Sequence, residues 1–272
     1  MAGGDGVAVT TNTTTVLKIG GSVLEPAPAP AFMAAVARTV AAGEKLVIVH
    51  GGGKALTALL GRLGVATEFK NGLRVTGAAT LQAAVMAFAG EVNTQLVAAL
   101  NRAGVAAVGL TGLDASSVRA RVADPELGAV GIPDAAEARL PRALLDAGYI
   151  PVYASLASDG DGGVLNVNAD QFAASLAGAL DAERMLFVTD VPGVLDANGG
   201  LIPQISLAGM EAMAASGAIR GGMLPKADAC RAALAGGAGT VTILGAEAAL
   251  RLDAIIAGPG TGTPCGTQVT RA

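Results

Sequence analysis

The sequence predicts an α/β fold in which a largely parallel sheet is covered by helices on both faces. Short apolar runs alternate along the chain with stretches whose apolar residues recur every three or four positions, the pattern of strands alternating with helices. The runs are apolar throughout, which is typical of strands buried on both faces. Hydrophobic residues make up 52% of the 272 residues, so the chain can bury a substantial core.

Composition and charge exclude several classes of protein. With 3% aromatic residues and a net charge of −4, the chain has neither the basic surplus nor the interleaved aromatics of a nucleic-acid-binding protein. Cys230 and Cys265 are too few for a disulfide framework or a zinc site. We see no signal-peptide pattern, and glycine or charge interrupts the longest apolar runs before they reach the length of a membrane span. We therefore expect a cytoplasmic protein that binds neither nucleic acid nor membranes.

The elements of the first half follow from these patterns in order. Residues 1–14 are rich in glycine and threonine and are expected to form a flexible tail. Continuous apolar runs predict buried strands at 16–19, 46–49, 105–110 and 150–154. Helical periodicity predicts helices at 32–40, 55–63, 81–100 (with Thr76 as a cap) and 140–147. The glycine- and aspartate-rich turn at 159–163 predicts a hairpin that continues through Val167.

The second half continues the alternation. Asn168 opens a predicted helix that ends at Leu180, and strands are predicted at 185–189 and 240–244. Helical pattern follows Lys226, and a further helix is predicted at 246–256. The last prediction is an edge strand at 268–270. A boundary between two lobes is expected near residue 173.

The few lysines gather beside glycine-rich turns. Lys18 precedes Gly20-Gly21, Lys54 follows His50-Gly51-Gly52-Gly53, and Lys226 follows Gly221-Gly222. Free backbone amides in such turns, together with the positive end of a following helix, favour an anion. Each short glycine motif is weak evidence alone, because a purely structural turn has the same composition. His50, the only histidine, is compatible with a functional group and with a satisfied residue at a strand end.

Polar residues elsewhere could bind a carboxylate or an amide. Arg74 could hold a carboxylate through two parallel hydrogen bonds, although it could equally be a surface arginine before a helix cap. Asn166, Asn168 and Asp170 alternate, so on an extended backbone they project from one face. The asparagines suit an amide or a carboxylate, and an aspartate can hold two lysines in place. An ordinary asparagine-rich turn beside a hairpin is the alternative.

Together these groups favour phosphoryl transfer. The sequence has no P-loop, protein-kinase or credible dinucleotide motif. Lysines, an arginine and free amides without an evident nucleophile suit a reaction that depends on positioning and charge neutralisation. A carboxylate acceptor would already be ionised at neutral pH and would need no general base.

Eight motifs in one order resemble the amino acid kinase family from about Val16 to Val269. They are Lys18-Ile-Gly-Gly-Ser, His50-Gly-Gly-Gly, Asn71-Gly-Leu-Arg-Val-Thr, Gly112-Leu-Asp114, Asn166-Val-Asn-Ala-Asp170, Thr189-Asp-Val-Pro-Gly-Val-Leu195, Gly221-Gly-Met-Leu-Pro-Lys226 and Gly266-Thr-Gln-Val269. The resemblance implies a three-layer αβα sandwich of the carbamate kinase type, with an acceptor-binding lobe at 15–173 and an ATP-binding lobe at 174–272. It also implies a homodimer that pairs through the helix near 76–101.

The resemblance also implies roles for individual residues. Lys18 and Lys226 would stabilise charge on the transferring phosphoryl group, and Asp170 would orient both lysines. Arg74 and the asparagines of the Asn166 motif would bind the acceptor. With Arg74, the residues implied to contact the acceptor are Gly52, Gly53, Asn166 and Asn168. The residues implied to contact the nucleotide are Gly20, Gly21, Gly51, Thr189, Asp190, Gly193, Leu195, Gly221, Gly222 and Met223.

The reaction implied is ATP-dependent phosphorylation of the γ-carboxylate of N-acetyl-L-glutamate, a step of arginine biosynthesis. Mg²⁺ would arrive with ATP, without a metal site built from protein ligands. The few residues before the first strand imply insensitivity to arginine, and the role of the 261–265 insertion stays open. One alternative is a kinase of carrier-bound aminoadipate in lysine biosynthesis, which the acidic composition disfavours because such a carrier is itself acidic. Another is a catalytically inactive regulatory module that binds a ligand.

Overall fold

A large twisted sheet forms the centre of the computed structural model, which describes residues 13–24, 29–70, 72–257 and 265–271. The predicted tail up to residue 12, Asn71 and most of the 261–265 insertion lie outside the described residues. Within them the sheet has eight strands. These are β1 (Thr14–Ile19), β2 (Lys45–His50), β5 (Ala107–Thr111), β8 (Ile150–Ala154), β11 (Arg184–Thr189), β12 (Gln204–Ser206), β13 (Thr240–Gly245) and β14 (Thr267–Thr270).

The strand order is β12-β14-β13-β11-β1-β2-β8-β5, and neighbouring strands are parallel except for the antiparallel pair β13 and β14. The predicted largely parallel sheet is therefore confirmed. The prediction that residues 268–270 form an edge strand is wrong. The short strand β12, which the sequence pattern did not reveal, pairs with the outer side of β14 and takes the edge itself.

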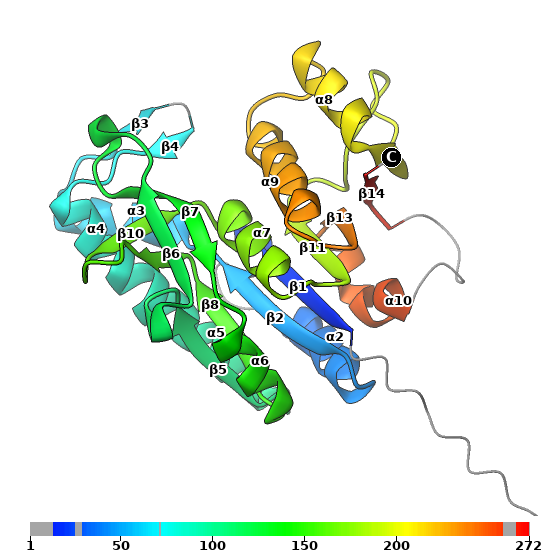
Figure 1. Ribbon diagram of the computed structural model, residues 1–272, viewed down its shortest axis with the longest axis horizontal. Helices are drawn as coiled ribbons and strands as arrows, with labels where there is room; N and C mark the ends of the chain where they lie inside the picture. Colours follow the sequence, from blue (N-terminus) through cyan, green and yellow to red (C-terminus); the bar gives the residue numbers. More distant parts are fainter. Residues whose placement is uncertain (1–12, 25–28, 71, 258–264, 272) are drawn as a thin grey trace, which may run out of the picture.

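Helices cover both faces of the sheet and complete the three-layer sandwich (Figure 1). One face carries α6 (Arg139–Asp146), α7 (Ala169–Ala179) and α9 (Met223–Ala235), with α8 (Leu207–Ala215) packed against α9. The other face carries α2 (Pro30–Ala41), α5 (Asn93–Arg102) and α10 (Leu252–Ala257). The helix predicted at 246–256 begins as a 3-10 turn at Ala248–Arg251 before α10. The predicted αβα fold class is confirmed.

One long helical stretch runs from Ala78 to Arg102 and changes its winding midway. It consists of α4 (Ala78–Val85), a π-helical segment (Met86–Val92) and α5. Its length and composition alone would suit a membrane span, contrary to the expectation from the apolar runs. However, 44% of its most apolar window is buried inside the protein, and Leu96 and Leu100 are wholly buried. A core helix passes the same test of length and composition, so the stretch is weak evidence for a membrane.

Smaller elements frame the acceptor side of the sheet. The strands β6 (Val118–Val122), β7 (Val130–Ala136), β9 (Leu156–Ser158) and β10 (Val164–Val167) pair in a closed ring. The predicted hairpin is the antiparallel pair β9 and β10. Two further short strands, β3 (Phe69–Lys70) and β4 (Leu73–Arg74), form another hairpin. The helices α1 (Gly21–Leu24) and α3 (Gly53–Leu63) follow β1 and β2, and 3-10 turns lie at Asp114–Ser116 and Pro125–Leu127.

The carboxyl ends of the central strands meet at one edge of the sheet. Ile19 at the end of β1 lies opposite His50 on β2 and Val188 on β11. The interior residues of these strands are fully buried, so the sheet is a rigid base for the turns that follow each strand. The expected lobe boundary at residue 173 lies inside the continuous helix α7, and the division into two lobes stays a prediction.

Candidate active site

Three glycine-containing turns lie side by side because β1, β2 and β11 end in register. The turn after β1 starts with Gly20, whose N–H donates to Val188 O at 3.0 Å. A Cβ at Gly20 would lie 3.0 Å from the same carbonyl oxygen, so glycine permits this close approach. The edge outside the carboxyl ends of parallel strands is where open α/β sheets bind ligands.

Asp170 joins two lysines from distant parts of the chain. Its Oδ1 lies 2.8 Å from Lys18 Nζ, and its Oδ2 accepts a hydrogen bond from Lys226 Nζ at 3.1 Å. All three side chains are largely buried, with 11%, 6% and 13% of the Lys18, Asp170 and Lys226 side chains exposed. The structure thus brings together the three residues for which the sequence implied a catalytic role.

Helix starts explain the position of this cluster. Asp170 lies in the first turn of α7, where the side-chain oxygen of Asn168 accepts from the N–H groups of Asp170 and Gln171 at 2.9 and 3.3 Å. The helix α9 starts directly after Gly221 and Gly222, and Lys226 lies in its first turn. The positive ends of both helix dipoles therefore lie at the site and add to its preference for anions.

The charge of the cluster is one positive unit, because two lysines share one carboxylate. Burial alone would raise the pKa of the Asp170 carboxyl, but the ammonium groups of Lys18 and Lys226 outweigh burial and lower this pKa below its ordinary value. Asp170 is therefore ionised at neutral pH. The uncompensated positive charge lies next to free backbone amides, an arrangement suited to an anionic group such as a phosphate.

A cavity of about 420 Å³ opens beside the cluster. It is lined by Lys18, Ile19, Gly20, Gly21, Leu24, Gly51, Gly52, Gly53, Lys54, Thr57, Phe69 and Arg74. Seven of the predicted site residues thus share one cavity: Lys18, Gly20, Gly21, Gly51, Gly52, Gly53 and Arg74. The cavity has a size typical of small-molecule sites.

Arg74 is fixed at the far side of this cavity. Its Nη2 donates to Thr57 Oγ1 at 2.7 Å and to Gly53 O at 3.3 Å, and its Nη1 donates to Thr67 Oγ1 at 3.2 Å. The guanidinium also lies over the Phe69 ring, 4.6 Å from its centroid. These contacts leave N–H donors on Nε and Nη1 for another acceptor.

The two predicted asparagines take different places. Asn166 Nδ2 donates to Thr76 Oγ1 at 3.2 Å, and the Thr76 hydroxyl donates to Arg74 O at 2.8 Å. Asn166 is therefore linked to the segment of Arg74, although it does not line the cavity. Asn168 uses its side-chain oxygen to cap α7, so its first task is to place Asp170.

Of the ten residues expected to contact the nucleotide, Gly20, Gly21 and Gly51 line the 420 Å³ cavity and the other seven do not. The Thr189 hydroxyl donates to Asp190 Oδ1 at 2.9 Å, and this hydrogen bond lowers the pKa of the Asp190 carboxyl. Gly193 has φ of +155°, and a Cβ there would lie 2.6 Å from both Leu201 and Thr267 side-chain atoms. Leu195 is 40% exposed. Gly221, Gly222 and Met223 begin α9, and none of these residues is among the described residues that line the 420 Å³ cavity.

Five residues that line the cavity have no role assigned from the sequence: Ile19, Leu24, Lys54, Thr57 and Phe69. Lys54 was noticed only as one of the lysines beside glycine. Thr57 stands one turn after Gly53 on α3, and its hydroxyl donates to Gly53 O at 2.8 Å. Thr57 could have been identified from the sequence, because it lies four residues after Gly53 on a helix that begins in the glycine turn and so faces the same side.

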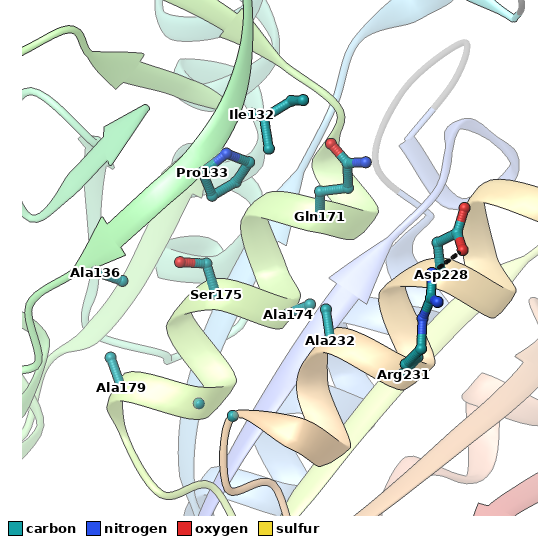
Figure 2. A pocket seen from close by; sticks show the side chains of 12 residues that line it. Ile132, Pro133, Ala136, Gln171, Ala174, Ser175, Ala179, Asp228, Arg231 and Ala232 are labelled. Carbon is teal, nitrogen blue, oxygen red and sulfur yellow. Dashed lines mark hydrogen bonds and ion pairs between the residues drawn. The ribbon is translucent and has the colours of Figure 1, made fainter. Parts of the chain in front are cut away.

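A second and larger cavity, of about 680 Å³, lies between β7, α7 and α9 (Figure 2). Figure 2 shows Gln171 and Ser175 on α7 facing Ile132 and Pro133, with the ion pair of Asp228 and Arg231 on α9. Size alone would favour this cavity as the site. However, none of the predicted site residues lines it, and half of its lining residues are alanine or glycine. The smaller cavity contains the charged groups and free amides that chemistry requires.

Comparisons with known proteins identify relatives of the whole chain. Residues 13–245 match the model of the amino acid kinase family. An acetylglutamate kinase of Acidiphilium cryptum is 43% identical over 245 residues, which cover 85% of this chain and 82% of that protein. An acetylglutamate kinase of Bradyrhizobium diazoefficiens is 45% identical over 231 residues, which cover 80% and 78% of the two chains.

Solved structures share the fold. A protein of Streptococcus mutans superposes with a TM-score of 0.82 at 30% identity over 95% of this chain and 99% of that one. An N-acetylglutamate synthase of Neisseria gonorrhoeae, in complex with coenzyme A and N-acetyl-glutamate, superposes with a TM-score of 0.79 at 25% identity over 96% of this chain and 60% of that one. A carbamate kinase of Giardia lamblia, at 16% identity and a TM-score of 0.70, shows the fold alone.

Proposed function

The chain belongs to the amino acid kinase family, and on this basis we propose that it transfers the γ-phosphoryl group of ATP to the γ-carboxylate of N-acetyl-L-glutamate. Its relatives of 43% and 45% identity are named acetylglutamate kinase, and each is matched over more than three quarters of its length. One observation carries the proposal. Asp170 joins Lys18, beside the glycine turn after β1, to Lys226 at the start of α9.

The reaction needs little covalent help from the protein. An oxygen of the acceptor carboxylate forms a bond to the γ-phosphorus while the bond to the bridging oxygen of ADP breaks, which gives an acyl phosphate and ADP. Lys18 and Lys226 neutralise the charge on the phosphoryl oxygens, and amides of the glycine turns donate to them. Because the acceptor is already ionised at neutral pH, no general base is required.

Arg74 supports the choice of a dicarboxylic acceptor. The N–H donors left on its Nε and Nη1 can bind the α-carboxylate at the far end of the cavity. Such binding leaves the γ-carboxylate directed toward Lys18. Asn166, which is linked to the Arg74 segment through Thr76, is the proposed partner of the acetamido group.

Mg²⁺ is proposed to enter with ATP, where it would neutralise the β- and γ-phosphates. The described residues contain no group of three or more His, Cys, Asp or Glu side chains that could hold a metal ion. Asp170 is occupied by two lysines, whereas the Asp190 carboxylate is only slightly buried and lies close enough to feel the charges of Lys226 and Lys18. A single carboxylate beside phosphate oxygens and water suits Mg²⁺.

ADP release from ATP and Mg²⁺ tests the function, with N-acetyl-L-glutamate, glutamate, N-acetylaspartate and aminoadipate compared as acceptors. We expect turnover with N-acetyl-L-glutamate and at least tenfold less with the other three. Turnover only with another acid would keep the kinase and reject the acceptor. No turnover with any acid would favour the regulatory module.

The two alternatives are separated by chemistry as well as by this assay. The synthase among the solved structures shows that the fold alone does not decide the reaction. A module that only binds ligand has no need for two buried lysines on one carboxylate, so the cluster favours the enzyme. A kinase of carrier-bound aminoadipate should bind an acidic carrier, and the net charge of −4 disfavours that partner.

We further propose a homodimer, and a cytoplasmic location consistent with the presence of only two cysteines in the sequence. The helix at 78–102 exposes apolar side chains at Val85 and Met86, which are 37% and 51% exposed. Met86→Glu should weaken pairing at least tenfold, as measured by sedimentation at graded concentrations. Leu195→Glu, at a leucine outside this helix that is 40% exposed, is the control. A variant that sediments like the wild type would reject this interface.

A further inference from the structure

The glycine turn at 51–53 is fixed from behind by His50, at the end of β2. His50 is fully buried. Its Nδ1 lies 2.7 Å from Gly51 O, and its Nε2 lies 2.9 Å from Asn93 Nδ2. An amide nitrogen only donates, so Nε2 accepts from Asn93, and the single ring proton on Nδ1 is donated to Gly51 O. The two contacts therefore define one neutral tautomer.

Asn93 is itself fixed in orientation. It is 5% exposed, and its Nδ2 also donates to Val152 O on β8 at 2.9 Å. Its Oδ1 lies against β5, where a Cβ at Gly109 would be only 2.1 Å away. The orientation of Asn93 is thus set by two strands of the sheet. Through Asn93 and His50, the sheet controls the Gly51 carbonyl.

Phe88, on the same helical stretch as Asn93, contacts Gly52, the next glycine of the turn. A Cβ at Gly52 would lie 2.6 Å from Phe88 Cδ1, so the Phe88 ring packs directly against the backbone of the turn. Phe88 is 5% exposed. Two side chains five positions apart in sequence are therefore linked to the turn, Phe88 directly and Asn93 through His50.

The π-helical segment explains how both can face the turn. In an α-helix, residues five positions apart point about 140° away from each other. Here the N–H of Asn93 donates to Phe88 O, a hydrogen bond across five residues that stacks the two positions. π-Helical segments are rare and occur often at functional sites.

We propose that the π-helical segment Met86–Val92 positions the glycine turn of the active site, with Phe88 packing on Gly52 and Asn93 orienting His50 against Gly51. His50, Phe88 and Asn93 are then positioning residues, since none of them lines the cavity. This proposal rests on the proposed function in one respect. The kinase reaction is what gives the turn its task, which is to direct its amides toward the reacting groups.

The single histidine allows a test that does not depend on activity. Long-range ¹H–¹⁵N correlation spectra of the untagged, ligand-free protein should show one ring tautomer, protonated on Nδ1, between pH 8 and pH 6. Asn93→Ala should convert this signal to a mixture of tautomers. The opposite tautomer in the wild type, or an unchanged signal in Asn93→Ala, would overturn the proposal.

Kinetics then test the effect on the reaction. Asn93→Ala and Phe88→Leu should each lower kcat about 10- to 100-fold and change KM less than threefold, because misplacing the turn affects the reacting geometry. His50→Asn, which retains a donor near Nδ1, should keep at least fivefold more activity than His50→Leu. Gln95→Ala, an exposed position on the same helix, is the matched control.

The outcomes separate the two proposals. A wild-type protein with the expected tautomer but no kinase activity would reject the proposed function. It would leave the inferred contacts of His50 with Gly51 and Asn93 standing. An active wild type whose Phe88→Leu and Asn93→Ala variants retain full kcat would reject the positioning role. Phe88→Leu is a mild change, so the test remains decisive if Asn93→Ala fails to fold.

Discussion

At the scale of single residues, Asp170 determines how the site is built. Its carboxylate pairs with Lys18 on β1 and with Lys226 on α9, which lies 56 residues after Asp170 in the sequence. Removing either lysine changes the charge available to the phosphoryl group, whereas removing Asp170 would leave two buried lysines without a counter-ion. The second change is expected to cost about 3–5 kcal/mol of stability.

Lys226→Ala separates catalysis from acceptor binding. We expect kcat to fall about 10²- to 10³-fold, because charge stabilisation in the transition state is lost. Affinity for N-acetyl-L-glutamate, measured by calorimetry, should change little because Arg74 and Asn166 remain. Lys45→Ala, which breaks a surface pair of 2.7 Å with Asp146, is the control and should keep wild-type turnover. Unchanged turnover in Lys226→Ala would refute the role of this lysine.

His50 makes stability depend on pH. Burial lowers the pKa of His50 from 6.5 to about 4. On acidification the unfolded chain therefore binds this proton first. The contribution is fully present above pH 6.5 and is lost as the pH falls toward 4, at up to about 1.4 kcal/mol per pH unit.

Urea unfolding at pH 7, 6 and 5 measures this dependence. The Asp170 carboxyl, whose pKa is also lowered, adds its own loss only below its ordinary value of 3.8 and so does not overlap with this range. His50→Gln cannot take up the proton and should show a flatter profile between pH 6.5 and 5. Equal slopes in the two proteins would show that His50 does not cause the loss.

At the scale of elements, α7 and α9 are joined at both ends. Asp170 and Lys226 pair where the helices begin, and the backbones touch where they end, since a Cβ at Gly178 would lie 3.0 Å from Gly236 O. Between these contacts and β7 lies the 680 Å³ cavity (Figure 2). The spacing of the two lysine-bearing elements therefore depends on a glycine contact far from the chemistry.

Gly178→Ala tests this contact. The added methyl group meets backbone, which cannot rotate away, and we expect a loss of about 1–3 kcal/mol in the free energy of unfolding. Gly61→Ala is the matched control, because a Cβ there meets nothing within 4 Å in α3. This control should gain about 0.5–1 kcal/mol from helix propensity. Urea denaturation of both variants measures the difference, and a stabilised Gly178→Ala would contradict the close contact.

The elements differ in how far the sequence could predict them. β1, β2, β8, β11 and β13 were predicted because each is a buried run of apolar residues. β6 was not predicted, although Arg119 and Arg121 alternate with buried residues, which is the period of a half-exposed strand. The three residues of β12 are too few for any periodicity. That omission also made β14 seem an edge strand.

The site shows the same division. Lysines beside glycine turns and a shared aspartate could be identified from motifs, although their roles stay predictions. The contribution of Asn93 could not be predicted from the sequence. A π-helical segment has the same apolar pattern as an α-helix, and no residue type in it indicates the changed winding. Contacts that depend on a local change in helix winding require coordinates.

At the scale of the whole molecule, the open cavity predicts closure. The 420 Å³ cavity is open to solvent, and the larger cavity leaves room where β7 meets α7 and α9. We expect the two predicted lobes to approach each other when a non-hydrolysable ATP analogue and N-acetyl-L-glutamate bind, since closure excludes water from an acyl phosphate. Small-angle scattering should show a smaller radius of gyration than in the ligand-free protein. Identical profiles would refute closure.

The position of β1 has a consequence for how the protein is made. β1, the first of the described strands, lies in the middle of the sheet, between β2 and β11 (Figure 1). β2 follows within a few dozen residues, but β11 ends only at Thr189. During translation, one side of β1 therefore exposes unpaired backbone groups until most of the chain has left the ribosome. An apolar strand with an open edge is prone to aggregate. Nascent chains that stall before residue 184 should consequently be bound by chaperones, whereas chains released at full length should fold.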